Sequence, residues 1–197
     1  VEPASLVGEV LAAATNTSMY TFEVAPVATL LEQSLISHLS EKIWGRPGDG
    51  IMTSGGSASN RQALLVARNE AVKNCKEVGL AFTESGRRPY VITSKEAHYS
   101  VKRACNILGL GHRGVVEAEP DSEGQLTADS VIEAAREMQS TGGAVVAVVA
   151  TAGTTVKGAF DDLSGIGKFC QDERIWFHVD GAYGASVLLS SSHRDLM

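Results

Sequence analysis

The sequence predicts an α/β protein built on a mainly parallel β-sheet with helices on both faces. Short apolar runs alternate with longer amphipathic stretches along most of the 197 residues, which is the order of repeated strand–helix–strand units. One run, AVVAVVAT at residues 144–151, is continuously apolar, as expected for a strand buried on both faces. The chain also contains 20 glycines, which suit tight turns between strands and helices.

Hydrophobic periodicity and helix end signals assign the individual elements. Helices are expected at residues 3–14, 22–44, 57–75, 98–109, 127–142 and 161–173, and strands at 50–54, 89–94, 114–120, 144–151 and 175–180. Pro26 suits the first turn of the second helix. Ser57 or Ser59 is expected to cap the third helix and Thr127 the fifth. Gly109 is expected to end the fourth helix.

The segment GRPGDG at residues 45–50 breaks the chain into two parts. We expect residues 1–46 to form an N-terminal helical segment and residues 47–197 to form the α/β domain. No internal repeat interrupts this organisation.

Composition restricts the class of partner. The net charge of −6 disfavours nucleic acid and acidic membrane surfaces, because both reward a basic protein face. The three cysteines lack the paired spacing of a disulfide framework or a zinc site, so we expect a reducing, cytoplasmic location and no metal. No apolar stretch reaches the roughly twenty residues that span a bilayer.

Ligands of parallel sheets bind beyond the carboxyl ends of the strands, so the four strand ends are the candidate sites. The first, TSGGSASN, places Gly55 and Gly56 before a helix that begins with Ser57 and Ser59. Close backbone approach, helix N–H groups and hydroxyls together make a phosphate cradle. An ordinary glycine turn with serine caps explains the same residues equally well.

The next two strand ends carry His98 in SKEAHYS and Thr151 in ATAGTT, followed by Thr154 and Thr155. His98 could stack on a flat ligand, and the threonines could bring hydroxyls into a pocket. A surface histidine and ordinary turn chemistry are the alternatives for each motif alone.

The last strand end is HVDGAYG, where Asp180 follows an apolar run. A buried carboxylate needs a cation or several donors. His178 is expected to face the opposite side of the strand. The four ends together indicate one planar, phosphorylated ligand with a protonatable ring nitrogen, and pyridoxal phosphate meets these demands. An aspartate that only caps the following turn is the alternative.

Four motifs resemble the group II pyridoxal-phosphate-dependent amino acid decarboxylases, which are fold-type-I enzymes. They are GGSASNRQALLVAR, HYSVKRA, ATAGTTVKGAFDDL and WFHVDGAYG. The upstream segment NTSMYTFEVAPVATLLE is most similar to the glutamate and cysteine sulfinate decarboxylase branch. The resemblance covers nearly the whole chain, with the motifs in family order.

The resemblance implies a role for each matching position. His98 and Asp180 would be catalytic, with His98 stacked on the cofactor ring and Asp180 paired with its nitrogen. Asn16 lies in a segment that approaches the substrate in this branch. The cofactor-binding set would be Ser57, Ala58, Ser59, His98, Thr151, Asp180 and Ala182.

The chain departs from the family after Asp180. Relatives carry a Schiff-base lysine in an Asn-Pro-His-Lys-like motif, whereas no lysine follows Asp180 here, and Lys157 has the wrong context. We therefore expect residues 47–197 to be part of a cofactor-binding large domain, truncated before that lysine and lacking the small C-terminal domain.

For the full-length protein, the resemblance implies a homodimeric carboxy-lyase that decarboxylates a small, acidic amino acid: glutamate, cysteine sulfinate or aspartate. The alternatives are another fold-type-I reaction, such as an aminotransferase or a lyase, and a non-catalytic fragment or pseudoenzyme. The fragment alone is expected to be inactive.

Overall fold

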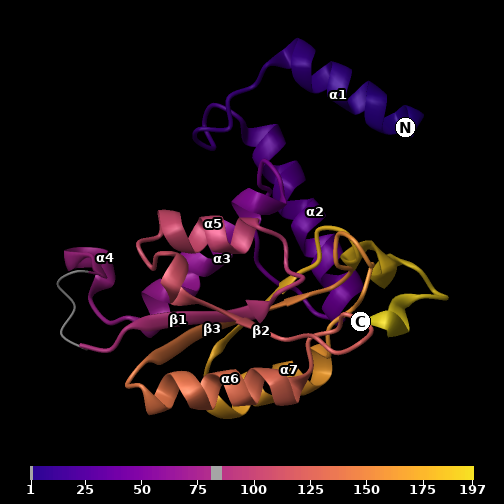
Figure 1. Ribbon diagram of the computed structural model, residues 1–197. Helices are drawn as coiled ribbons and strands as arrows, with labels where there is room; N and C mark the ends of the chain where they lie inside the picture. Colours follow the sequence, from indigo (N-terminus) through magenta and orange to yellow (C-terminus); the bar gives the residue numbers. More distant parts are fainter. Residues whose placement is uncertain (1, 81–85) are drawn as a thin grey trace. The chain divides into compact units, whose positions relative to one another are not determined.

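The computed structural model describes residues 2–80 and 86–197 (Figure 1). The chain divides into two compact units, Val1–Met52 and Thr53–Met197. In the described residues, no helix combines the length and the apolar character needed to cross a membrane.

The first unit contains two helices, α1 (Pro3–Thr15) and α2 (Pro26–Trp44), and each begins with a proline in its first turn. The role predicted for Pro26 is therefore confirmed. The predicted start at residue 22 was wrong, because residues 22–25 form a turn in which the Ala25 N–H bonds the Thr21 carbonyl at 3.1 Å. The left-handed Gly45, with φ of 65°, ends α2.

The second unit is a four-stranded sheet in the order β2-β1-β3-β4, and every pairing is parallel. This confirms the predicted fold class. The strands are β1 (Pro89–Ser94), β2 (Val115–Ala118), β3 (Ala144–Thr151) and β4 (Trp176–Asp180). The helices are α3 (Gly56–Ala71), α4 (Cys75–Val78), α5 (Ser100–Ile107), α6 (Ala128–Ser140) and α7 (Leu163–Glu173).

Helices cover both faces of the sheet, as Figure 1 shows: α3 and α5 lie on one face, and α6 and α7 on the other. Alternating residues of β1 serve the two layers. Val91 packs with Leu64 and Cys105 of the first pair of helices, whereas Ile92 packs with side chains of the second pair, Val131 and Ile166 among them. The central strand β3 is buried from Val146 onward, as its apolar run predicted.

Two local predictions were wrong. Residues 50–54 form no strand; the Met52 N–H donates instead to Glu32 Oε1 at 2.7 Å. A short apolar run without a neighbouring strand has no ladder of hydrogen bonds to join. The N-cap of α3 is Gly55, with no side-chain cap bond, rather than a serine.

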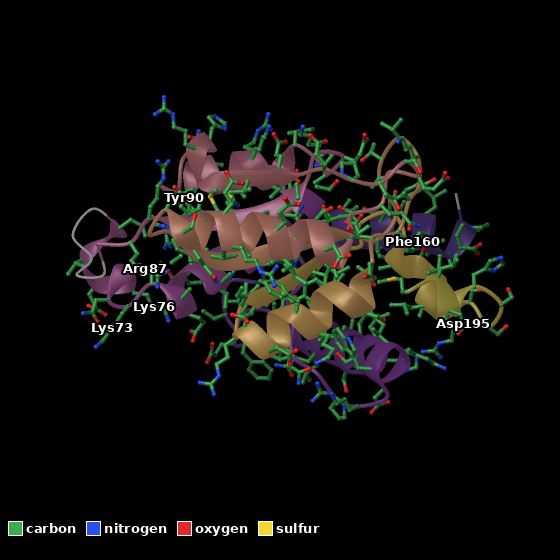
Figure 2. The ribbon with its side chains drawn as sticks, turned by 60° about the horizontal axis from the view of Figure 1, so that its bottom comes forward. Lys73, Lys76, Arg87, Tyr90, Phe160 and Asp195 are labelled. Carbon is green, nitrogen blue, oxygen red and sulfur yellow. The ribbon has the colours of Figure 1, made fainter. Side chains whose placement is uncertain are left out.

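Other helix ends agree with the sequence. Thr127 Oγ1 accepts the Ser130 N–H at 3.2 Å and caps α6 as predicted. Gly109, with φ of 81°, follows the end of α5. Figure 2, turned so that α6 and α7 come forward, shows Tyr90 and Phe160 at opposite ends of the sheet unit. Tyr90 lies near the start of β1, and Phe160 pairs with Ala152 beyond the end of β3, so Phe160 marks the carboxyl edge.

Candidate active site

A pocket of about 320 Å³ lies at the carboxyl edge of the sheet. Residues that follow β1, β3 and β4 line it together with the first turn of α3. The lining residues are Gly56, Ser57, Asn60, His98, Ser100, Thr151, Gly153, Thr155, Asp180, Ala182 and Tyr183. Its volume falls in the range of small-molecule sites, and its position is where a parallel sheet collects ligands.

The start of α3 forms one wall. Gly55 has a φ of 137°, which an L side chain rarely adopts, and the chain turns there into the helix. A Cβ at Gly56 would lie 3.1 Å from Ala182 Cβ, so glycine permits close packing against the turn after β4. The free N–H groups of this 16-residue helix therefore begin at the pocket, beside Ser57.

Asp180 is 8% exposed at the end of β4. Its Oδ2 accepts a hydrogen bond from Asn60 Nδ2 at 2.8 Å, and its Oδ1 accepts one from the Ala182 N–H at 3.2 Å. Within residues 2–80 and 86–197, no ion pair involves Asp180. The pocket thus contains a nearly buried carboxylate that has two donors but no cation.

Asn60 also joins the two histidines of the site. Its Nδ2 donates to Ser100 Oγ at 2.9 Å, and Ser100 Oγ lies 2.8 Å from His98 Nδ1. Its Oδ1 lies 2.7 Å from His178 Nε2. The prediction that His178 faces away from Asp180 was therefore wrong, because residues two apart in a strand share a face.

Burial of the His178 ring lowers its pKa, and the nearby Asp180 carboxylate opposes this shift. Because its pKa is lowered from the usual value, His178 is neutral near pH 7. Burial also raises the pKa of Asp161. The N–H groups of Leu126 and Thr151 oppose this rise, whereas the charge of Asp121 adds to it.

Thr151 ends β3 with its side chain in the pocket wall. Its N–H donates to Asp161 Oδ2 at 2.6 Å. Its Oγ1 is buried and has no hydrogen-bond partner in the part of the chain that the structure describes. Buried hydroxyls are normally bonded, so this one is available to a bound group.

The structure brings most of the sequence-predicted residues together. Ser57, His98, Thr151, Asp180 and Ala182 all line the pocket. Ala58 lines an adjoining hollow, and Ser59 lines neither space because its Oγ bonds Thr53 Oγ1 at 2.6 Å. Asn16 belongs to the first unit, where it ends α1 with a left-handed φ of 43°.

Sequence reasoning missed Asn60, Ser100, Gly153 and Tyr183 as lining residues. Asn60 and Ser100 each lie within a quoted motif, and each is polar at a buried position of a helix. A polar residue on the apolar face of a helix is a signal that could have found them. Of the three threonines, Thr151 and Thr155 line the pocket, whereas Thr154 Oγ1 accepts the Ala159 N–H.

Comparison with known proteins identifies related chains. Residues 2–197 match a family model described as the pyridoxal-dependent decarboxylase conserved domain. A cysteine sulfinic acid decarboxylase of Mus musculus is 38% identical over 198 residues, which covers all of this chain and 39% of that relative. An acidic amino acid decarboxylase of Homo sapiens, GADL1, is 39% identical over 193 residues, covering 98% of this chain and 36% of the relative.

A crystal structure of mouse CSAD has the same fold, with a TM-score of 0.95 and 38% identity. The match covers 100% of this chain and 41% of that one. The chain therefore spans about two fifths of the length of the relatives that it matches. The resemblance drawn from the sequence motifs is confirmed.

Proposed function

The chain belongs to the pyridoxal-dependent decarboxylase family, and we propose that the full-length protein is a carboxy-lyase that releases CO2 from an acidic amino acid. The observation that carries this proposal is the nearly buried Asp180 carboxylate, which pairs with no cation among the described residues and lies in a pocket at the sheet's carboxyl edge. Pyridoxal phosphate is the cofactor that the family implies.

The residues of the pocket fit this cofactor. The Asp180 carboxylate suits a protonated ring nitrogen. The start of α3 and the Ser57 hydroxyl suit a phosphate, because helix N–H groups and the helix dipole favour an anion. The unpartnered Thr151 Oγ1 suits a polar substituent of the ring.

Each residue would contribute binding, orientation or charge. When bound, pyridoxal phosphate supplies an electron sink for the pair left by departing CO2. Asp180 would keep a proton on the ring nitrogen, since the buried carboxylate favours a neighbouring positive charge. His98 would restrict the tilt of the ring, and Ser57 would anchor the phosphate.

Ala58, Ser59, Ala182 and Asn16 complete the proposed set. Ala58 and Ser59 would shape the first turn of α3 beside the phosphate, because their N–H groups donate to the Gly55 carbonyl at 2.9 and 3.1 Å, and Ala182 would pack beneath the ring. Asn16 would approach the substrate. The described residues that line the pocket include no lysine.

An acidic substrate is supported by the names of the relatives, a cysteine sulfinic acid decarboxylase and an acidic amino acid decarboxylase. Cysteine sulfinate, glutamate and aspartate are the candidates. An aminotransferase or a lyase would use the same residues around the cofactor, and a pseudoenzyme would keep the pocket without the reaction.

A homodimer is supported by the first unit. Within its described residues only Ala25 and Ser40 are buried, while Leu6, Val10 and Leu31 are 57%, 60% and 66% exposed. Such apolar surface favours association. A cytoplasmic location is supported by the free, buried Cys75, Cys105 and Cys170. Sedimentation and cell fractionation test these two points.

The first experiment uses the full-length protein with added pyridoxal phosphate. Borohydride reduction followed by peptide mapping should place the cofactor on a lysine beyond Met197. CO2 release should then follow from one of the three acidic amino acids and not from an aromatic one. A reduced protein without a cofactor adduct contradicts the proposal, and keto-acid formation without CO2 favours an aminotransferase.

A further inference from the structure

A continuous hydrogen-bonded network runs along the pocket wall from His98 to His178. It passes from His98 through Ser100 and Asn60 to Asp180 and His178. Asn60 is 2% exposed and is the branch point of the network. It comes from α3, whereas its partners come from β4 and from the start of α5.

The chemistry of the partners determines which way the Asn60 carboxamide faces. An ionised Asp180 can only accept hydrogen bonds, so the amide nitrogen must face it. The two hydrogens of Nδ2 are then used by Asp180 Oδ2 and Ser100 Oγ. The oxygen Oδ1 is left to accept a hydrogen bond from His178 Nε2.

The same logic assigns the proton of His98. Ser100 Oγ accepts from Asn60, so its own hydrogen is free to be donated to His98 Nδ1. The Ser100 N–H also donates to this nitrogen, at 3.3 Å. Both contacts favour an Nδ1 that accepts hydrogen bonds, which puts the ring proton on Nε2.

We propose that Asn60 is the positioning residue of this site: its one carboxamide orients the Asp180 carboxylate and, through Ser100, holds His98 as the Nε2–H tautomer. The inference rests on the proposed function, because its value lies in presenting both side chains to pyridoxal phosphate. Asp180 would otherwise keep a single donor, the Ala182 N–H, and its carboxylate could rotate. The Ser100 hydroxyl would also lose the Asn60 donor that leaves its own hydrogen for His98 Nδ1, so the tautomer of His98 would no longer be selected.

Two ligands separate this role from simple packing. Pyridoxal phosphate carries a ring nitrogen, whereas its 1-deaza analogue has a C–H group at the same position. In the full-length protein, Asn60→Ala should weaken pyridoxal phosphate binding about tenfold and analogue binding less than threefold, as measured by calorimetry. The preference for pyridoxal phosphate should therefore fall.

Asn69→Ala is the matched control. Asn69 lies on the same helix, bonds Arg68 and Cys75, and does not line the pocket. It should change the affinity for neither ligand. Equal weakening of both ligands by Asn60→Ala, or no change in either, overturns the inference. If the wild-type protein fails to bind pyridoxal phosphate, the proposed function itself fails.

The tautomer is tested separately by nitrogen NMR of histidine-labelled protein, with His98 assigned by its loss in His98→Gln. Wild-type Nδ1 should give the signal of an unprotonated ring nitrogen. Ser100→Ala should shift this signal while leaving the preference between the two ligands intact. A protonated Nδ1 in the wild type overturns the inference even if Asn60→Ala does not fold.

Discussion

Two carboxylates lie buried near the carboxyl edge of the sheet, and they are held differently. Asp161 is 4% exposed and accepts backbone N–H bonds from Leu126 at 2.8 Å and Thr151 at 2.6 Å. Asp180 is 8% exposed and accepts from the Asn60 side chain and the Ala182 backbone. Only Asp180 lines the pocket.

The difference separates a carboxylate that serves the fold from one that we propose serves the cofactor. Asp161 joins its own segment to Leu126, 35 residues earlier in the chain, and its bond from the Thr151 N–H fixes the end of β3. Its oxygens are both used by the backbone, so it has little to offer a ligand. Asp180 is oriented by a side chain that belongs to the site, and it has no cation among the described residues. Burial alone therefore does not identify a functional acid.

The largest expected effect comes from Asp180→Asn in the full-length protein. The substitution preserves the shape of the side chain but removes the negative charge that favours a protonated ring nitrogen. CO2 release should fall about 10²–10³-fold. Circular dichroism should show an unchanged fold. Activity within a few-fold of the wild type would contradict the role assigned to this carboxylate.

Asp161→Ala should instead affect stability. It leaves the buried N–H groups of Leu126 and Thr151 without acceptors, at a cost of about 2–4 kcal/mol in the free energy of unfolding. Urea denaturation measures the loss. Asp162→Ala is the control, because this exposed neighbour only caps α7 through Gly165 and should cost about 1 kcal/mol. Equal losses would remove the distinction.

Thr151→Val tests whether the Thr151 hydroxyl serves ligand binding rather than the stability of the fold. Its hydroxyl bonds none of the described residues, so its removal should leave the cofactor-free protein as stable as the wild type or slightly more stable. The affinity for pyridoxal phosphate should fall about tenfold.

The matched control for this threonine is Thr154→Val. Thr154 Oγ1 accepts the Ala159 N–H at 3.1 Å, so this variant should lose about 1 kcal/mol of stability and keep its affinity. Thermal unfolding and calorimetric titration measure the two quantities. The opposite pattern in the two variants would show that the Thr151 hydroxyl serves the fold.

The smallest effect concerns His178, whose pKa burial lowers from its usual 6.5. As the pH falls below 6.5, His178 is protonated in the unfolded chain but stays neutral in the folded protein, so the free energy of unfolding declines. His178→Gln should make this decline shallower, by at most about 1.4 kcal/mol per pH unit. Urea denaturation at neutral pH and about one unit below 6.5 measures the slope, and an unchanged slope would contradict the assignment.

Much of the second unit follows from local patterns. The run at residues 144–151 became β3 with the same bounds, and Thr127 caps α6, because periodicity and capping depend on near neighbours in sequence. Since ligands of parallel sheets bind at the carboxyl ends of the strands, His98, Thr151 and Asp180 could be predicted to share one pocket, and all three line it. The predicted strand at 50–54 failed because a strand requires a partner that local pattern does not specify.

The amino-acid sequence alone determined the parallel α/β fold, the family and the strand ends that meet at the pocket. Only the tertiary structure decided that Asn60 contacts Asp180, 120 residues away, and that both oxygens of Asp161 accept hydrogen bonds from backbone N–H groups. Strand and helix patterns repeat over a few residues, whereas a hydrogen bond between distant side chains depends on how packed elements bring single atoms within about 3 Å.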